Sequence, residues 1–443
     1  MKETTIKAPK TKKTTSNEYS ELTIRITEEL SKDVKKAHGI FITPRTLITI
    51  LGDRVLQLYP PNNLQFIIEP SCGTCEFIRY LDSKLNNTTI HAVELNQTIF
   101  SQIEESSSSF TNNNVSLFNR DFLEFYPPEG VLYDLCIGNP PYVVLKKEDV
   151  PSRFSNYSVG RPNLFGLFII HSLSLLKSNG ILAFVVPNSF LNSAYYSKIR
   201  SHIKSSCNIL DIIDFKETNL FIDTAQDTFG LIIQKREEDL SPSICNFSYR
   251  TFNDWVFTSN SIRLQQILDG STTLLKMGCF VKTGNVVWNQ HKERLTTNET
   301  DTILLYNSNL GCSQTIELKN FQEISNNKKS KTDTIEEKAQ YINLDGSTIE
   351  RKKGCAIIVN RGNGNSKYKL NYALVPEDFP YYVAENHLNV IDICCDDQSV
   401  KLDIFSKIIK SFQDPRTTQF IDMFLGNNGL SKTELETIFP IYL

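Results

Sequence analysis

Apolar residues recur along residues 39–236 in two alternating patterns, short continuous runs and longer stretches with helical spacing. Short runs bounded by turn residues are typical of buried strands, and apolar positions three and four residues apart are typical of helices. Strands are predicted at the start of 64–85 and within 89–96, 115–125, 133–142, 181–191, 209–215 and 227–236. Helices are predicted within 39–58, at the end of 64–85 and within 98–110, 163–180 and 194–206.

Two of the predicted helix ends have recognisable end signals. Thr43-Pro44 places a capping hydroxyl before a proline at the first helical position, which favours a helix start there. Gly180 follows an apolar helical stretch, and glycine commonly ends helices. Strands that alternate with helices predict an α/β fold, a Rossmann-like doubly wound sheet. Ligands of such sheets lie beyond the carboxyl ends of the strands.

The pattern changes after about residue 240. Helical periodicity fades, and strand-like runs return at 354–362 and 386–395. We therefore predict three parts: a disordered basic tail at 1–20, an α/β domain at 21–240 and a mixed, β-leaning domain at 241–443.

Charge and composition narrow the class of protein. The formal net charge is −3, so a nucleic-acid surface would need its basic groups gathered on one face or in a cleft. No stretch reaches the ~20 apolar residues of a membrane helix, and the N-terminus lacks the apolar core of a signal peptide. We expect a cytoplasmic protein without a membrane partner. The ten cysteines include one Cys72-x-x-Cys75 pair but no second pair, so no metal site is predicted.

Three loops at predicted strand ends carry candidate binding residues. In "EPSCGTCEF" (69–77), Gly73 lets the backbone approach a ligand, and the helix start offers free N–H groups. Glu94 ends the next strand, where an acid commonly accepts hydrogen bonds from ribose hydroxyls. In "NRDF" (119–122), Asp121 can accept a hydrogen bond from an adenine amino group, and Phe122 can stack beneath the ring.

The most specific stretch is "GNPPY" (138–142). The side-chain carbonyl of Asn139 and the backbone carbonyl of Pro140 can accept two hydrogen bonds from one –NH₂ group, and Pro140-Pro141 keeps that corner rigid. Tyr142 offers a flat face on which a planar base or amide can stack. This arrangement suits attack by an amino group on an electrophile.

Taken in order, these motifs resemble the AdoMet-dependent amino-methyltransferases. The likeness is to the gamma-type adenine-N6 DNA methyltransferases of type II restriction–modification systems, over residues 39–236. It implies S-adenosyl-L-methionine (AdoMet) as cofactor, double-stranded DNA as partner, base flipping, and direct in-line attack without a metal. The implied cofactor residues are Thr43, Glu69, Cys72, Gly73, Glu94, Asp121, Phe122 and Phe168. The sequence departs from the family pattern at Glu69, usually Asp, and at Cys75, usually Gly.

The resemblance also implies that the C-terminal domain recognises the target. "KTGNVVWNQHKERLT" (282–296) and "YYVAENHLNVI" (381–391) are similar to recognition segments of the family, and a basic glycine loop spans 360–369. The implied substrate contacts are Phe221, Trp288, Arg361 and Lys367. A monomer is expected, and a cognate restriction endonuclease that acts separately stays open.

Three alternatives stay open as well. N4-cytosine methyltransferases more often have serine at the Asn139 position. Protein-glutamine and RNA amino-methyltransferases also use the tetrapeptide Asn-Pro-Pro-Tyr, which is Asn139–Tyr142 in this sequence. The glutamine enzymes, however, lack a long C-terminal region like the one after residue 240. A restriction component that binds DNA without methylating it is the third alternative, although "ERKK" (350–353) has no convincing nuclease set around it.

Overall fold

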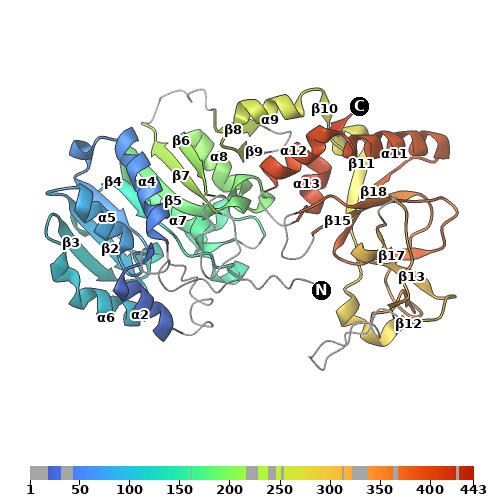
Figure 1. Cartoon of the computed structure of the whole chain (residues 1–443), viewed down its shortest axis with the longest axis horizontal. Helices are drawn as coiled ribbons and strands as arrows, with labels where there is room; N and C mark the ends of the chain where they lie inside the picture. Colours follow the sequence, from blue (N-terminus) through green and yellow to red (C-terminus); the bar gives the residue numbers. More distant parts are fainter. Residues whose placement is uncertain are drawn as a thin grey trace, which may run out of the picture. The chain divides into compact units, whose positions relative to one another are not determined.

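The computed structural model describes residues 18–30, 43–160, 162–215, 228–237, 246–250, 254–311, 314–321, 338–362, 368–425 and 429–443. Two compact units divide the chain (Figure 1). The first unit runs to Arg250 and includes Asp254–Ser261, and the second runs from Ile262 to Leu443. None of the described helices is both long and apolar enough to cross a membrane.

A seven-stranded sheet lies at the centre of the described part of the first unit, in the order β3-β2-β1-β4-β5-β7-β6. The first four of these strands pair in parallel with one another and with β5, whereas β7 runs antiparallel between β5 and β6. The strands are β1 Phe66–Glu69, β2 Thr89–Glu94, β3 Asn114–Asn119, β4 Tyr133–Gly138, β5 Leu176–Pro187, β6 Cys207–Asp214 and β7 Thr228–Lys235. The predicted doubly wound α/β sheet is therefore present.

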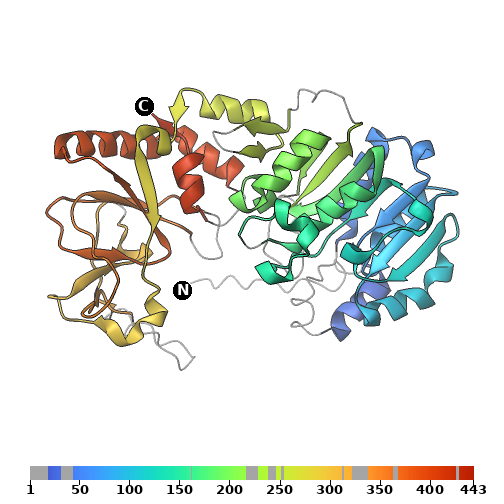
Figure 2. The same cartoon turned by 180° about the vertical axis from the view of Figure 1, so that it is seen from behind.

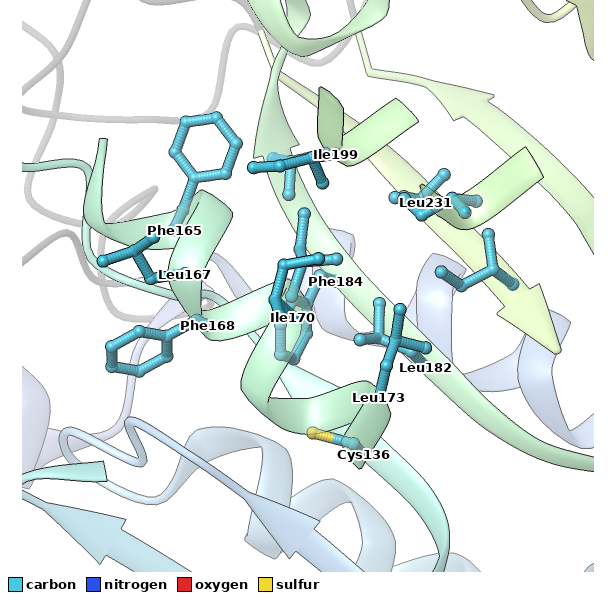
Figure 3. Packing of buried hydrophobic residues seen from close by; sticks show 14 of the residues in the cluster. Cys136, Phe165, Leu167, Phe168, Ile170, Leu173, Leu182, Phe184, Ile199 and Leu231 are labelled. Carbon is cyan, nitrogen blue, oxygen red and sulfur yellow. The ribbon is translucent and has the colours of Figure 1, made fainter. Parts of the chain in front are cut away.

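Helices cover both faces of this sheet (Figures 1 and 2). One face packs against α4, α5 and α6, and the other packs against α7 and α8. The helices of this unit are α2 Glu21–Glu29, α4 Arg45–Leu58, α5 Glu76–Lys84, α6 Gln97–Glu105, α7 Leu164–Leu175 and α8 Ser197–Ser206. Along β4, Leu135 and Ile137 enter one core while Cys136 enters the other, as the two-residue period of a strand requires. Figure 3 shows α7 packing its apolar side chains toward the central strands.

Several predicted boundaries shift in the structure. The prediction that Thr43 caps α4 is wrong, because Pro44 is the N-cap residue and no side chain caps the helix. The prediction that Gly180 ends α7 is also wrong, since the helix ends at Leu175 and β5 begins at Leu176. Ser20, assigned to the tail, is the N-cap of α2, and its hydroxyl accepts a hydrogen bond from the Thr23 amide.

The end of the first unit also lies later in the chain than residue 240. Strands β8 (Ser248–Arg250) and β9 (Trp255–Phe257) pair with each other and belong to this unit. The fully buried Arg200 of α8 attaches these two strands to the rest of the first unit. It forms an ion pair with Asp254 and donates to the carbonyl oxygen of Trp255 at 2.5 Å.

The described part of the second unit is rich in strands. One sheet has the order β11-β18-β15-β16 and another the order β12-β14-β13-β17. The strands are β10 Ser271–Thr272, β11 Cys279–Thr283, β12 Leu295–Thr296, β13 Thr302–Leu305, β14 Tyr341–Ile342, β15 Ala356–Asn360, β16 Tyr372–Val375, β17 Tyr382–Ala384, β18 Leu388–Ile393 and β19 Ile441–Tyr442. The helices are α9 Ser261–Leu268, α11 Gln398–Phe412, α12 Pro415–Phe424 and α13 Lys432–Thr437. This composition agrees with the predicted mixed, β-leaning second part.

Candidate active site

A pocket of about 380 Å³ opens at the carboxyl ends of β1, β2 and β4 in the first unit. Its volume is within the range of small-molecule sites. Every residue predicted to hold the cofactor lines it, together with two residues of the predicted catalytic tetrapeptide. These residues are Thr43, Glu69, Cys72, Gly73, Glu94, Asp121, Phe122, Asn139, Pro141 and Phe168.

The loop between β1 and α5 leaves room for a ligand. Gly73 has φ +50°, and a Cβ atom placed there would meet no atom within 4 Å. Cys75 stands at the N-cap of α5 with φ 64°, a left-handed conformation that glycine adopts more readily than other residues. The geometry of this position accounts for the glycine that the family pattern usually has there.

Glu69 is buried at the end of β1, with 2% of its surface exposed. Among the described residues its Oε2 atom has no hydrogen-bond partner. Burial raises the pKa of this carboxyl well above its usual range, and the nearby carboxylate of Glu94 acts in the same direction. A cationic amino group in the pocket would offset both effects, since an opposite charge favours the ionised carboxylate.

Glu94 holds the loop between β1 and α5 from the end of β2. Its Oε2 accepts from the Gly73 amide at 2.9 Å, and its Oε1 accepts from the Asn96 amide at 2.7 Å. Burial raises the pKa of Glu94, while these backbone hydrogen bonds oppose the shift. Each carboxylate oxygen can accept more than one hydrogen bond, so the same carboxylate can also receive ligand hydroxyls.

Aromatic rings form another wall of the pocket. The rings of Phe122 and Phe168 are 4.9 Å apart between centroids, at an interplanar angle of 43°. Phe122 begins a short 3₁₀ turn, Phe122–Glu124, and Asp121 caps that turn through a hydrogen bond from the Leu123 amide to its Oδ1 at 2.8 Å. The structure therefore places the predicted Asp-Phe pair and Phe168 together.

Asn139 follows β4, and its side-chain amide contacts hydroxyl groups on two sides. Its Nδ2 donates to Thr43 Oγ1 at 2.9 Å, and its Oδ1 accepts from the Tyr142 hydroxyl at 2.6 Å. The Tyr142 hydroxyl also lies 3.0 Å from the carbonyl oxygen of Val185. Burial raises the pKa of Tyr142 well above its usual range, so this hydroxyl keeps its proton and remains a donor.

The rest of the tetrapeptide is packed around this amide. Pro140 is buried, whereas Pro141 is half-buried and lines the pocket. The Tyr142 ring is half-buried and meets Phe165 edge to face, with centroids 5.9 Å apart. The backbone carbonyl of Asn139 accepts from Ser71 Oγ at 3.1 Å, which joins the tetrapeptide to the loop after β1.

Sequence reasoning missed several residues of the pocket wall. Ser71, Leu95 and Asn96 each line it, and the Leu95 side chain is 56% exposed. An apolar residue directly after a strand-end acid is the signal that could have identified Leu95. Ser71 carried no signal of its own, because its bond to Asn139 joins distant parts of the chain.

Of the four residues predicted to contact DNA, the two that the structure describes lie in the second unit. Trp288 is 8% exposed in an apolar cluster of the second unit, with Lys292 and Lys338 over its ring. Arg361 follows β15, and its Nη1 donates to the Asn386 carbonyl oxygen at 2.8 Å. Phe221 and Lys367 lie outside the described residues. Within the described residues, no three His, Cys, Asp or Glu side chains are grouped so that they could hold a metal ion.

Comparison with known sequences finds a family match within the first unit. Residues 64–221 match the family model of the Eco57I restriction-modification methylase. The chain is 31% identical over 241 residues to the modification methylase CviBIII of Paramecium bursaria Chlorella virus NC1A, and this match covers 53% of the chain and 58% of that protein. It is 25% identical over 430 residues to the type II methyltransferase M.CvrRI of Paramecium bursaria Chlorella virus XZ-6E, covering 96% of the chain and 99% of that protein.

Solved structures with similarity to the chain include two restriction proteins. The type IIG restriction endonuclease BpuSI matches 95% of this chain and 60% of its own, at 11% identity and a TM-score of 0.42. The M protein of the type I restriction enzyme EcoKI matches 45% of each chain, at 17% identity and a TM-score of 0.37.

The donor set of the pocket fits AdoMet. An unpartnered carboxyl oxygen on Glu69 suits its amino group, Glu94 suits ribose hydroxyls, and the pair Phe122 and Phe168 suits a planar base. The space above Gly73 admits a ligand close to the backbone. Residues 64–221 thus form a methyltransferase domain of the restriction–modification type, with S-adenosyl-L-methionine as its cofactor.

Proposed function

We propose that the chain is a site-specific DNA methyltransferase that methylates the N6 amino group of adenine in a short DNA word. The observation that carries this proposal is that Asn139 lines the same pocket as Glu69, Gly73 and Glu94. An acceptor for an amino group therefore stands next to the groups that suit AdoMet. The names of the viral relatives, a modification methylase and a type II methyltransferase, support DNA as the substrate.

The bound AdoMet would supply a methyl group on a positively charged sulfur. Asn139 Oδ1 and the Pro140 carbonyl would accept hydrogen bonds from the adenine amino group and so direct its lone pair toward the pocket. Tyr142 would hold the extruded base by its ring. The base must leave the duplex, because its amino group is otherwise paired and stacked. The catalytic effect of these residues is positioning and electrostatic stabilisation.

The amide contacts around Asn139 support this role for it. Thr43 Oγ1 accepts from Nδ2, which fixes the rotation of the amide and keeps Oδ1 on the opposite side. A preorganised acceptor of this kind is worth most when charge develops on the attacking nitrogen. Loss of one such contact typically costs on the order of 10²–10³ in rate.

Sequencing of modified bases in DNA from cells that express the chain tests the proposal. We expect N6-methyladenine at one word with the parental chain and far less of it with folded Asn139→Ala, whose AdoMet affinity should stay close to the parental value. N4-methylcytosine in that word would instead support the cytosine alternative. DNA without any modified word, together with specific DNA binding, would support a restriction component that does not methylate.

A further inference from the structure

A turn at residues 385–387 joins β17 to β18 in the second unit, among the orange strands of Figure 1. Segments distant in sequence hold its backbone. The amide of Asn386 donates to the carbonyl of Val286 at 2.9 Å, and the amide of Arg361 donates to the carbonyl of His387 at 2.8 Å. Stretches 282–296, 360–369 and 381–391, which the sequence pattern singled out separately, therefore meet at this turn.

Glycines allow these segments to approach closely. A Cβ atom on Gly284 would lie 2.1 Å from the carbonyl oxygen of Glu385, and one on Gly429 would lie 2.4 Å from that of Arg361. Backbone stands in the way at both positions, so a side chain could not be accommodated by a rotamer change. Gly284 thus brings its backbone against the turn itself, and Gly429 brings its backbone against Arg361, whose amide is bonded to the turn.

A buried carboxylate orients one exposed imidazole on this turn. Glu385 is 4% exposed, and both of its oxygens bind His387: Oε1 lies 2.5 Å from the ring Nδ1, and Oε2 accepts from the backbone amide at 3.1 Å. The His387 side chain is 69% exposed. Because a carboxylate only accepts, the ring carries a hydrogen on Nδ1, which leaves the Nε2 edge for a ligand. With that single ring hydrogen, Nε2 is an acceptor.

Unpaired polar atoms surround the turn. Among the described residues, Asn386 Oδ1, Asn307 Oδ1 and Arg361 Nε are buried without a hydrogen-bond partner. Asn307 lies near the turn as well, since its Nδ2 donates at 3.3 Å to the carbonyl of Gly362, the residue after Arg361. Most buried polar atoms in native proteins are paired, so three unpaired atoms around one turn call for an explanation, and a ligand is one.

The balance of these groups points to base edges as that ligand. The two unpaired amide oxygens are acceptors, and the unpaired Arg361 Nε is a donor. A phosphate offers acceptors alone and could satisfy only Arg361 Nε, whereas a base edge can also offer donors to the unpaired acceptors. Adenine and cytosine present amino donors in the major groove, and asparagine is a common partner of adenine.

We propose that the 385–387 turn reads a base edge in duplex DNA, with His387 Nε2 accepting from the amino group of an adenine or a cytosine. Glu385 is then a positioning residue that holds the imidazole. The inference rests on the proposed function for its ligand, because duplex DNA is the substrate assigned there.

Selection of bound words from a random duplex library, with the full-length chain, tests this inference. The parental chain should enrich one word, and His387→Ala should lose discrimination at one position of it. The expected loss is about 5- to 150-fold, the range of one mismatched base pair. Glu385→Gln should lose part of the same discrimination. Lys407→Ala, an exposed change on α11, serves as the control and should enrich the parental word.

The possible outcomes separate the two proposals. Uniformly weaker binding of His387→Ala to all words, with a salt slope smaller by about one, would indicate a phosphate contact and overturn the base contact. An unchanged word in a His387→Ala chain that unfolds at the parental temperature would overturn it too, as would a parental chain that enriches no word. A chain that enriches a word and relaxes it through His387, yet methylates no DNA, would reject only the proposed function.

Discussion

Tyr142 illustrates how one hydroxyl contacts two acceptors in the site. Its single proton can be donated to Asn139 Oδ1, 2.6 Å away, or to the Val185 carbonyl, 3.0 Å away. In the structure it occupies one of the two lone-pair positions of the acceptor that the proposed mechanism assigns to the substrate. An arriving amino group can take that acceptor while the hydroxyl turns to Val185, so no hydrogen bond of the tyrosine is lost.

Substitution of this residue separates the roles of its hydroxyl and its ring. Tyr142→Phe removes the competing donor but keeps the stacking face, so we expect methyl transfer and DNA affinity close to the parental values. Tyr142→Ala removes the face, and base–aromatic stacking is worth ~1–3 kcal/mol per base. Single-turnover kinetics on a duplex with one target adenine can compare the variants. Equal damage in both would mean that the hydroxyl, not the ring, is required.

At the scale of elements, hydrogen bonds between polar side chains join α2 to the stretch 69–77, which connects β1 to α5. Thr23 Oγ1 donates to Glu76 Oε1 at 2.6 Å and lies 2.7 Å from Thr74 Oγ1, and all three residues are buried. The Ser20 amide also donates to Glu76 Oε1 at 3.2 Å. Because Thr74 and Glu76 line the pocket, the hydrogen bonds from α2 help to hold this part of the pocket wall in place.

Thr23→Val keeps the shape of this side chain but removes its hydroxyl. Loss of a buried hydrogen bond typically costs about 1 kcal/mol, so we expect a lower unfolding temperature and weaker AdoMet binding. Thermal unfolding and calorimetric titration with AdoMet measure the two effects. Arg25→Ala, an exposed change on the same helix, should alter neither. If Thr23→Val has the parental unfolding temperature and AdoMet affinity, these hydrogen bonds do not support the site.

At the scale of the whole molecule, the point at which the first unit ends determines whether it can stand alone. A chain truncated after Ser261 keeps β8 and β9, and with them Asp254 and the Trp255 carbonyl that pair with buried Arg200. A chain truncated after residue 240 leaves that guanidinium without these partners. Breaking a buried ion pair by removing one partner costs roughly 3–5 kcal/mol.

We therefore expect the 1–261 chain to bind AdoMet and the 1–240 chain to unfold at a markedly lower temperature. Calorimetry and thermal unfolding of the two truncated chains provide the comparison. Specific binding to the DNA word should be absent from both, since the second unit is proposed to read it. Methylation of the parental word by the 1–261 chain would contradict this division of labour.

The sequence by itself determined the α/β fold and predicted a set of residues that lie around one pocket. Alternating strand and helix patterns predict the sheet, because residues on a strand alternate between two cores and those on a helix recur every three to four positions. Strand-end residues such as Glu69 and Glu94 could be placed together because parallel strands end at one edge of a sheet. The structure places all the predicted cofactor residues around one pocket.

Only the tertiary structure decided contacts between distant parts of the chain. The hydroxyl of Thr43 has the local signal of a helix cap, but it instead accepts a hydrogen bond from Asn139, 96 positions along the chain. Gly180 has the local signal of a helix end, yet it lies within β5. A Cβ atom at this position would lie 3.0 Å from the backbone oxygens of Lys177 and Tyr133. Likewise, the sequence gives no sign of how His387 is oriented, because its orientation depends on the buried carboxylate of Glu385. Local patterns report backbone preference, whereas these contacts depend on which segments folding brings together.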